Sequence, residues 1–242
     1  MRFKKHINDF LIHHLMVDYN LSFRKPFSDV RKLIIGIVVN ILPIVNLISF
    51  GYTLESSDIK RGEQTDKMEE WEDFGGFFVK GLLAFIASLI YGIPALIVGI
   101  IAFVVALGPL FGQLALMGPQ KVQMMNPEEF FPIFVPYILA ALPLVVFMAI
   151  LILIATYVAP VAVLNYIKTD NFSEAFNFKE ITKYIFTGEY IVVWLLVLVL
   201  NLGLVGLLSN VPIIGTAIAS FITGMIGFSL YAGVMMGLDK KN

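Results

Sequence analysis

The sequence contains forty-nine consecutive residues, from Tyr190 to Leu238, without a single Asp, Glu, Lys, Arg or His. The hydrocarbon core of a bilayer is about 30 Å thick, and a helix crosses it with about 20 apolar residues. The run is therefore long enough for two membrane-spanning helices. Ser209, Asn210 and Pro212 favour a turn near its middle, which predicts helices over 190–208 and 212–238.

Composition indicates the same class of protein. Hydrophobic residues make up 58% of the chain and charged residues 14%, whereas soluble domains average about 45–50% and about 25%. We therefore expect an all-α integral membrane protein whose main partner is the lipid bilayer. The formal net charge of -1 gives no indication of a nucleic-acid partner. The chain has no cysteine, which excludes disulfides and thiolate metal sites.

Three further charge-free runs lie earlier in the chain and predict three more spans, near 33–54, 79–107 and 135–166. Gly108-Pro109 and Gly118-Pro119 predict poorly helical backbone between the second and third of these spans. An alternative with six spans would divide 77–118 near Pro94. Together the five spans are expected to form one helical membrane domain over 33–238, interrupted by an acidic loop over 55–78.

Residues 1–32 predict an amphipathic lead-in on the membrane surface. Apolar side chains recur at helical spacing in its first half, at Phe3, Ile7, Phe10 and Leu11. His6, Asp9 and His13 share one face and could hold a metal, but a solvated polar face explains them better.

In the acidic loop, Glu69-Glu-Trp-Glu-Asp73 could bind a cation, although a solvated helix start anchored at the interface by Trp71 is the better explanation. We expect no metal site.

Location and orientation follow from the same runs. We expect a multi-pass protein of the cell membrane. With five spans, lysine and arginine divide almost evenly between the two sides, so the positive-inside rule does not decide the orientation. The first span is preceded by Arg24, Lys25, Arg31 and Lys32, which favours a cytoplasmic N-terminus.

Residues 20–34 also resemble residues 171–185, and three intervening spans would make this a weak inverted repeat.

The membrane-spanning segments contain uncharged polar residues beside prolines, and these are the candidate ligand residues. Asn40 and Asn46 flank Pro43, Tyr91 precedes Pro94, and Tyr157 precedes Pro160. Proline kinks a helix and can make room for a lipid or a small neutral solute. The alternative is that these polar groups make hydrogen bonds between helices. No charged residue lies in the middle of a span, since Lys80 and Glu55 lie at span ends. No catalytic set or nucleotide loop is visible, so we expect neither an enzyme nor a cofactor.

The last predicted helix carries small residues at four-residue spacing, at Gly215, Ala219, Thr223 and Gly227. Small side chains let helix backbones approach closely. This helix is therefore expected to pack centrally in the bundle, with a contact between two copies of the chain as the alternative.

Several short motifs are similar to one family of membrane proteins. They are Leu33-Ile-Ile-Gly36, Pro43-Ile-Val-Asn46, Gly51-Tyr-Thr-Leu54, Glu70-Trp-Glu-Asp-Phe74, Gly81-Leu82, Tyr157-Val-Ala-Pro160, Phe172-Ser-Glu-Ala-Phe176 and Pro212-Ile-Ile-Gly215. The chain resembles, over roughly residues 18–237, the family catalogued as domain of unknown function four thousand and thirteen, which is found chiefly in archaea and some bacteria. Met68-Glu69 stand where that family often has a proline. The resemblance implies a multi-span membrane protein and assigns no functional residue.

Two functional hypotheses follow. The first is a membrane protein that binds or transports a lipid or small neutral solute between kinked helices. The second is a non-catalytic scaffold or assembly subunit of a membrane complex, in contact with another membrane protein or with a second copy of the chain.

Overall fold

The structure is a computed structural model that describes residues 17–241. Every regular element in this part of the chain is a helix, which confirms the expected all-α class. In chain order the helices are α2 (Tyr19–Arg24), η1 (Lys25–Phe27), α3 (Val30–Ile41), α4 (Asn46–Glu55), α5 (Phe74–Met117), α6 (Pro119–Met124), α7 (Pro127–Thr169), η2 (Phe172–Phe176), α8 (Phe178–Ile185), α9 (Gly188–Leu208) and α10 (Ile214–Asp239). The predicted amphipathic stripe over residues 3–11 lies outside the described residues.

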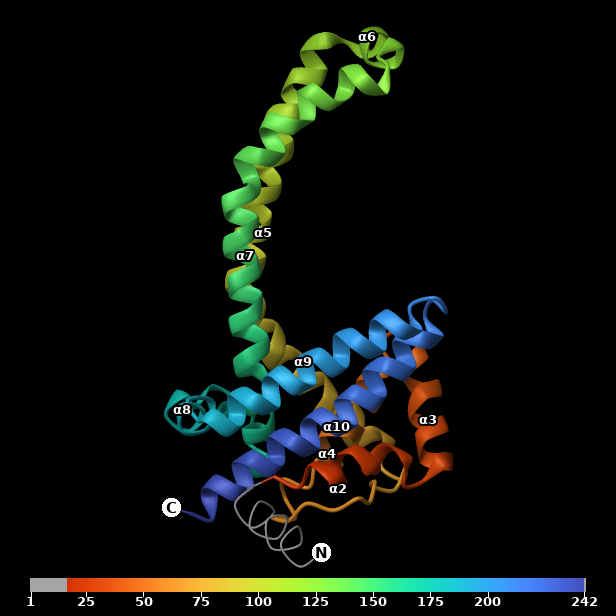
Figure 1. Cartoon of the computed structure of the whole chain (residues 1–242), viewed down its shortest axis with the longest axis vertical. Coiled ribbons are helices and arrows are strands. Elements are labelled where there is room, and N and C mark those ends of the chain that lie inside the picture. Colours follow the sequence, from red (N-terminus) through yellow and green to blue (C-terminus); the bar gives the residue numbers. More distant parts are fainter. Residues whose placement is uncertain (1–16, 242) are drawn as a thin grey trace, which may run out of the picture. The chain divides into compact units, whose positions relative to one another are not determined.

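The helices form two compact units (Figure 1). The core unit contains the described residues up to Ser88 and those from Tyr157 onward, and the hairpin unit contains Leu89–Thr156. Four helices within the described residues are long and apolar enough to cross a membrane, namely α5, the Phe131–Thr169 part of α7, α9 and α10. The protein is therefore a multi-span membrane protein.

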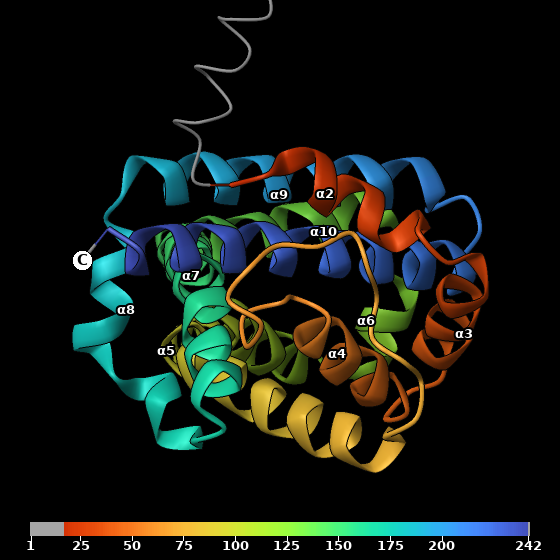
Figure 2. The same ribbon diagram turned by 90° about the horizontal axis from the view of Figure 1, so that it is seen from below.

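The helices α9 and α10 occupy nearly the same residues as the helices expected over 190–208 and 212–238. They run side by side in the core unit and are joined by a short turn (Figures 1 and 2). A Cβ atom on Gly215 would lie 1.9 Å from the carbonyl oxygen of Leu208, so this position accepts only glycine without rearrangement of the turn.

The single helix expected over 33–54 is instead two shorter helices, α3 and α4. Leu42 precedes Pro43, and the proline ring disfavours the helical conformation at the residue before it. Leu42 is accordingly extended, with φ -88° and ψ 121°. Ile44 then takes a positive φ of 69°, which reverses the chain direction.

The two long helices extend well beyond their predicted ends. The helix expected over 79–107 is part of the 44-residue α5, and the one expected over 135–166 is part of the 43-residue α7. Pro94 and Pro109 both lie inside α5, so neither ends the helix; prolines are tolerated in membrane helices, where other groups satisfy the freed carbonyls. The chain leaves α5 only at Gly118, whose φ is 78°.

Among the described residues, two candidate spans, α5 and α7, lie between the similar segments 20–34 and 171–185. An inverted repeat needs an odd number of spans between its copies. The described spans therefore do not give these segments opposite orientations.

The core unit is built around α10. Most residues of α10 from Gly215 to Met236 are buried, and α9, α3, α4 and α2 all contact it. Its small residues permit close approach: a Cβ atom on Gly227 would lie 3.1 Å from a methyl group of Val197 on α9, and one on Gly224 would lie 3.6 Å from Thr53 on α4. Conversely, the Phe221 ring of α10 lies directly against Gly36 of α3.

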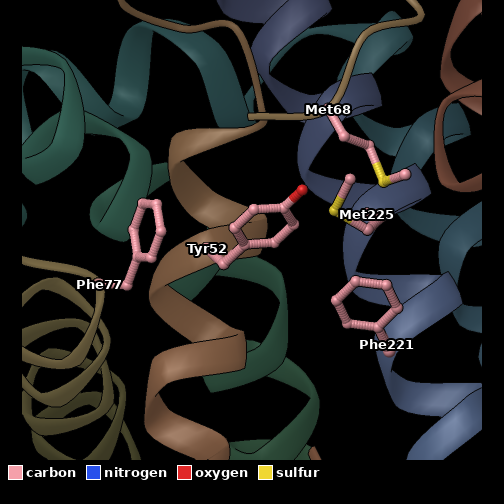
Figure 3. Packing of buried hydrophobic residues seen from close by; sticks show 5 residues of the cluster. All are labelled: Tyr52, Met68, Phe77, Phe221 and Met225. Carbon is pink, nitrogen blue, oxygen red and sulfur yellow. The ribbon is translucent and has the colours of Figure 1, made fainter. Parts of the chain in front are cut away.

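A buried aromatic and methionine cluster joins α10 to α4 and α5 (Figure 3). It consists of Tyr52, Met68, Phe77, Phe221 and Met225. Each of these side chains is at most 5% exposed. Their close packing fills the space between the helices, so the cluster fixes α4 between the start of α5 and α10.

The hairpin unit consists of two antiparallel helix segments. A Cβ atom on Gly99 of α5 would lie 2.9 Å from the sulfur of Met148 on α7. Further along, the hydroxyl of Tyr137 donates to the side-chain oxygen of Gln113 at 3.0 Å. These two contacts set the pairing of α5 with α7 in this unit.

The crossing of α4 with α5 depends on two glycines. A Cβ atom on Gly51 would lie 1.9 Å from the carbonyl oxygen of Phe77, and one on Gly81 would lie 1.9 Å from that of Leu47. The two backbones therefore touch at this crossing. Each glycine belongs to one of the motifs quoted above for the family resemblance.

We expect Gly51→Ala to lower the free energy of unfolding by about 1–3 kcal/mol, because the added methyl group must push the two backbones apart. The matched control is Gly203→Ala on α9, where a Cβ atom meets nothing within 4 Å and alanine should be neutral or favourable. Thermal unfolding of both variants in the same detergent is the measurement. Equal stability of the two variants would show that the crossing can relax.

Candidate functional site

A buried ion pair between Lys25 and Asp58 organises the polar part of the core unit. Lys25 follows α2 directly in η1, and Asp58 lies in the loop after α4. Both side chains are 0% exposed. The Lys25 ammonium donates to the Asp58 carboxylate and, at 2.7 Å, to the carbonyl oxygen of Ser56. Burial lowers the pKa of Lys25, and the hydrogen bond to Asp58 opposes that shift.

Asp58 also holds the loop in its folded form. Its φ is 67°, in the left-handed region that Asp and Asn tolerate better than most residues. Its carboxylate accepts from the Arg61 guanidinium at 2.7 Å and from the backbone N–H of Thr65 at 2.8 Å. Arg61 in turn donates to Glu69. With the Thr65 hydroxyl at 3.2 Å, this one carboxylate thus gathers four donors, three from the loop and one from Lys25 in the lead-in.

Gln64 connects this loop to α2 and α10. Its side-chain oxygen accepts from the backbone N–H of Asp18 at 2.7 Å. Its amide nitrogen donates to the Ser22 hydroxyl at 3.0 Å and to the carbonyl oxygen of Ser229 at 3.1 Å. A Cβ atom on Gly233 would lie 2.6 Å from the Gln64 amide. The loop can therefore approach α10 only because position 233 is glycine.

Tyr52 and Trp71 complete the attachment of the loop. Their rings stack with centroids 3.7 Å apart. The Tyr52 hydroxyl donates to the carbonyl oxygen of Glu69 at 2.8 Å, and the Trp71 indole N–H donates to that of Lys32 at 3.2 Å. Burial raises the pKa of Tyr52. Trp71, which we expected as an interfacial anchor, instead packs against the buried Tyr52.

A second set of ion pairs joins helix ends that are distant in sequence. Lys60 binds Glu55 at 3.2 Å and Asp170 at 2.6 Å, and Lys80 of α5 binds the same oxygen of Glu55 at 2.9 Å. Burial disfavours the charge on Lys60, but its bonds to Asp170 and Glu55 outweigh this and raise its pKa. The ends of α4 and α7 and the start of α5 are thereby tied together.

The C-terminal end of α10 is tied to the same region by Asp239. One oxygen of its carboxylate pairs with Lys168 of α7 at 2.6 Å, and the other accepts from the Tyr184 hydroxyl of α8 at 2.7 Å. Burial and the hydrogen bond to Asp239 raise the pKa of Tyr184. The charged groups of the core unit therefore form interhelical contacts.

Three of the predicted ligand residues lie at the α3–α4 turn. The Asn40 side chain donates to the carbonyl oxygen of Ala217 at 2.9 Å and to the Ser220 hydroxyl at 2.7 Å, both on α10. Pro43 lies in the turn and Asn46 begins α4, and both are exposed. The Asn40 side chain, which we expected to bind a ligand, is thus used in hydrogen bonds between α3 and α10.

The other four predicted ligand residues lie on α5 and α7. The Tyr157 hydroxyl donates to the carbonyl oxygen of Ile185, and its own carbonyl oxygen accepts from the Tyr190 hydroxyl. Pro160 follows one turn later in the same helix and is half-buried. Tyr91 and Pro94 lie on the part of α5 that belongs to the hairpin unit, where Pro94 is exposed. Asn40 thus donates to α10, whereas Tyr157 donates to the end of α8.

The four small residues predicted to mediate packing, Gly215, Ala219, Thr223 and Gly227, are all buried on α10. The Thr223 hydroxyl has no hydrogen-bond partner within the described part of the chain. These positions make the central contacts of the core unit already described.

Sequence reasoning missed Lys25, Asp58 and Gln64. Lys25 and Asp58 are 33 residues apart, and Gln64 and Ser229 are 165 apart. No helix or strand periodicity relates such positions, because their pairing depends on the tertiary fold. Among residues 17–241, no three His, Cys, Asp or Glu side chains lie close enough to hold a metal ion. The candidate set His6, Asp9 and His13 lies outside the described residues.

We expect Lys25→Met to lower the free energy of unfolding by up to about 3–5 kcal/mol, because the Asp58 carboxylate loses its buried cation and keeps only the partly exposed Arg61. Lys67→Met, at an exposed lysine of the same loop, should change stability by less than about 0.5 kcal/mol. Unfolding in mixed micelles measures both variants.

The double variant Lys25→Met/Asp58→Asn separates the ion pair from general packing. Asparagine tolerates the positive φ and removes the unpaired charge, so the double variant should lose less stability than the sum of the two single variants. Additive losses would contradict a direct interaction between the two side chains.

Comparison with known proteins agrees with the resemblance carried by the quoted motifs. The family model described as "Protein of unknown function (DUF4013)" matches residues 34–231, which is most of the chain. No curated protein and no solved structure matches it. The matched segment begins in α3 and ends in α10, so it includes the polar loop, three candidate spans and most of the fourth. The chain therefore belongs to the family described as DUF4013, a protein of unknown function.

Proposed function

We propose that this protein is a non-catalytic assembly subunit of a complex in the cell membrane, and that the far part of its α5–α7 hairpin contacts another membrane protein. The observation that carries the proposal is the length of these two apolar helices. They are much longer than a membrane crossing requires.

The mismatch between helix and bilayer is large. At about 1.5 Å per residue, the 44 residues of α5 measure about 66 Å. Membrane helices tilt by up to about 40°, and at that tilt about 26 residues cross a 30 Å hydrocarbon core. Counted from Gly81, the first residue of the charge-free run, such a crossing ends near Ala106.

The residues beyond that point remain strongly apolar and exposed. Phe111 is 62%, Leu116 90%, Met124 82% and Phe131 72% exposed in the structure. Large exposed apolar patches mark interaction surfaces, because water disfavours them. Hydrocarbon cannot cover all of this length in a single crossing, so an apolar protein surface is the partner whose chemistry fits.

Binding of a neutral solute between kinked helices has less support. The polar groups of Asn40 and Tyr157, which would hold such a solute, already make hydrogen bonds to neighbouring helices. A ligand would have to replace these bonds. We therefore favour the assembly role over that of a carrier.

The orientation that we propose places the charged face in the cytoplasm. If all four candidate spans cross, the segment before α5, the α7–α9 connection and the end of α10 share one side. Of the 14 lysines and arginines in the described part of the chain, all but Lys121 lie on that side or within two turns of it. Cytoplasmic segments of membrane proteins are enriched in these residues. With five spans, lysines and arginines were expected to divide evenly between the two sides. With four spans they lie mostly on one side, because residues 33–54 are not a span.

The natural absence of cysteine allows a direct test of this orientation, because single cysteines can be added without background. We expect Glu63→Cys and Lys179→Cys in intact cells to resist a membrane-impermeant maleimide until the membrane is opened. Val211→Cys should react at once, since it lies in the short connection between α9 and α10 on the other side. All three positions are exposed. Reaction of Glu63→Cys and Val211→Cys from the same side would refute the four-span arrangement.

The assembly role predicts a complex of fixed stoichiometry, seen by native mass spectrometry after extraction in mild detergent. Phe111→Glu/Leu116→Glu should abolish the complex without lowering the thermal stability of the chain, because both side chains are exposed. Phe186→Glu, just after α8 and outside the candidate spans, is the matched control; Phe186 is 78% exposed in the wild type, so the complex should stay intact. A wild-type chain that is always alone, or that carries only a bound lipid or solute, would refute the assembly role.

A further inference from the structure

We propose that α3 and α4 form a re-entrant hairpin, which dips into the bilayer and returns to the side it entered from, with lipid hydrocarbon covering its outer face and tip. This inference concerns a surface that the assembly role does not use. It holds for either orientation of the protein in the membrane.

The helix α3 is apolar on its inner face and also on the exposed face that adjoins it. Its inner face carries Leu33, Gly36, Ile37 and Asn40, which contact the core cluster or α10. Its outer face carries Val30, Ile34 and Val38, which are 64%, 56% and 54% exposed. A helix at a water-facing surface has a polar outer face, whereas one that is apolar all round is surrounded by protein or lipid.

The tip of the hairpin has the same character. Leu42 is 51% and Ile44 72% exposed, and Pro43 between them is also exposed. Part of the backbone there is bonded internally: the N–H groups of Asn46, Leu47 and Ile48 donate to the carbonyl oxygens of Leu42, Ile44 and Val45. These bonds reduce the number of backbone polar groups that the turn would expose to hydrocarbon.

The hairpin is too short to cross. With 12 and 10 residues, α3 and α4 measure about 18 Å and about 15 Å, against a hydrocarbon core of about 30 Å. No charged residue lies between Leu33 and Leu54. The hairpin can therefore enter the hydrocarbon, but its two ends must stay on one side.

Charged residues lie at both ends of the hairpin, away from its tip. Arg24 and Arg31 are exposed on the chain that enters α3. Glu55, which closes α4, pairs with Lys60 and Lys80. Arginine side chains at this position can reach the anionic phosphates of lipid headgroups while apolar side chains enter the hydrocarbon. This charge pattern fits a membrane surface as the partner.

The test is a depth measurement on the full chain in vesicles of phosphatidylcholine and phosphatidylglycerol. A nitroxide on Ile44→Cys or Val38→Cys should collide readily with oxygen, which concentrates in hydrocarbon, and poorly with a water-soluble nickel complex. We expect the ratio of the two collision rates to match that of Val199→Cys, on the exposed face of α9, and to exceed several-fold that of Glu63→Cys in the loop. All four wild-type side chains are exposed, so the labels should not disturb the fold.

Three results would overturn the proposal. A ratio at Ile44→Cys equal to that at Glu63→Cys would place the tip in water. Low collision rates with both reagents would show that protein covers it. Labelling of Asn20→Cys and Glu63→Cys by an impermeant maleimide from opposite sides of the membrane would show that the segment crosses.

Discussion

The core unit depends on close packing around α10. Helices in a bilayer gain no hydrophobic free energy by leaving lipid for each other, so contact area and hydrogen bonds must hold them together. The small residues of α10 provide that area, since Gly224 and Gly227 admit α4 and α9 and Gly36 of α3 accepts the Phe221 ring. Polar groups add to it where the helices meet, as Asn40 does with Ala217 and Ser220.

The loop after α4 shows how charge is kept beside such a bundle. Its Asp58 carboxylate and the Lys25 ammonium are fully buried, which is tolerable only because each satisfies the other and both bind further groups. Tyr52 and Trp71 close the same loop over the aromatic cluster. The loop is therefore an integral part of the core unit.

The sequence predicted some elements well, for physical reasons that also explain its failures. The helices α9 and α10 could be located because an unbroken apolar run contains one strong turn signal, at residues 209–212. Gly108-Pro109 also predicted an interruption of the helix, but this prediction was wrong. Pro109 lies inside α5, because a proline within a membrane helix need not end it. At Leu42-Pro43 the opposite error occurred. The apolar run over 33–54 is long enough for one span and was predicted as one helix, but the chain reverses direction there between α3 and α4. The buried ion pair could not be predicted, because it depends on which loops the packed helices bring together.

The long separation between Gln64 and its partner on α10 has a consequence for how the protein is made. The Lys25–Asp58 pair joins residues that leave the ribosome within a short interval of each other, so this part of the loop can order early. The bonds from Gln64 to Ser229, and the fit of its amide beside Gly233, require a helix that is synthesised about 165 residues after the loop. Domains begin to fold as they emerge, and contacts between distant residues close late. The polar loop can therefore take its final form only after α10 has been made and packed against it.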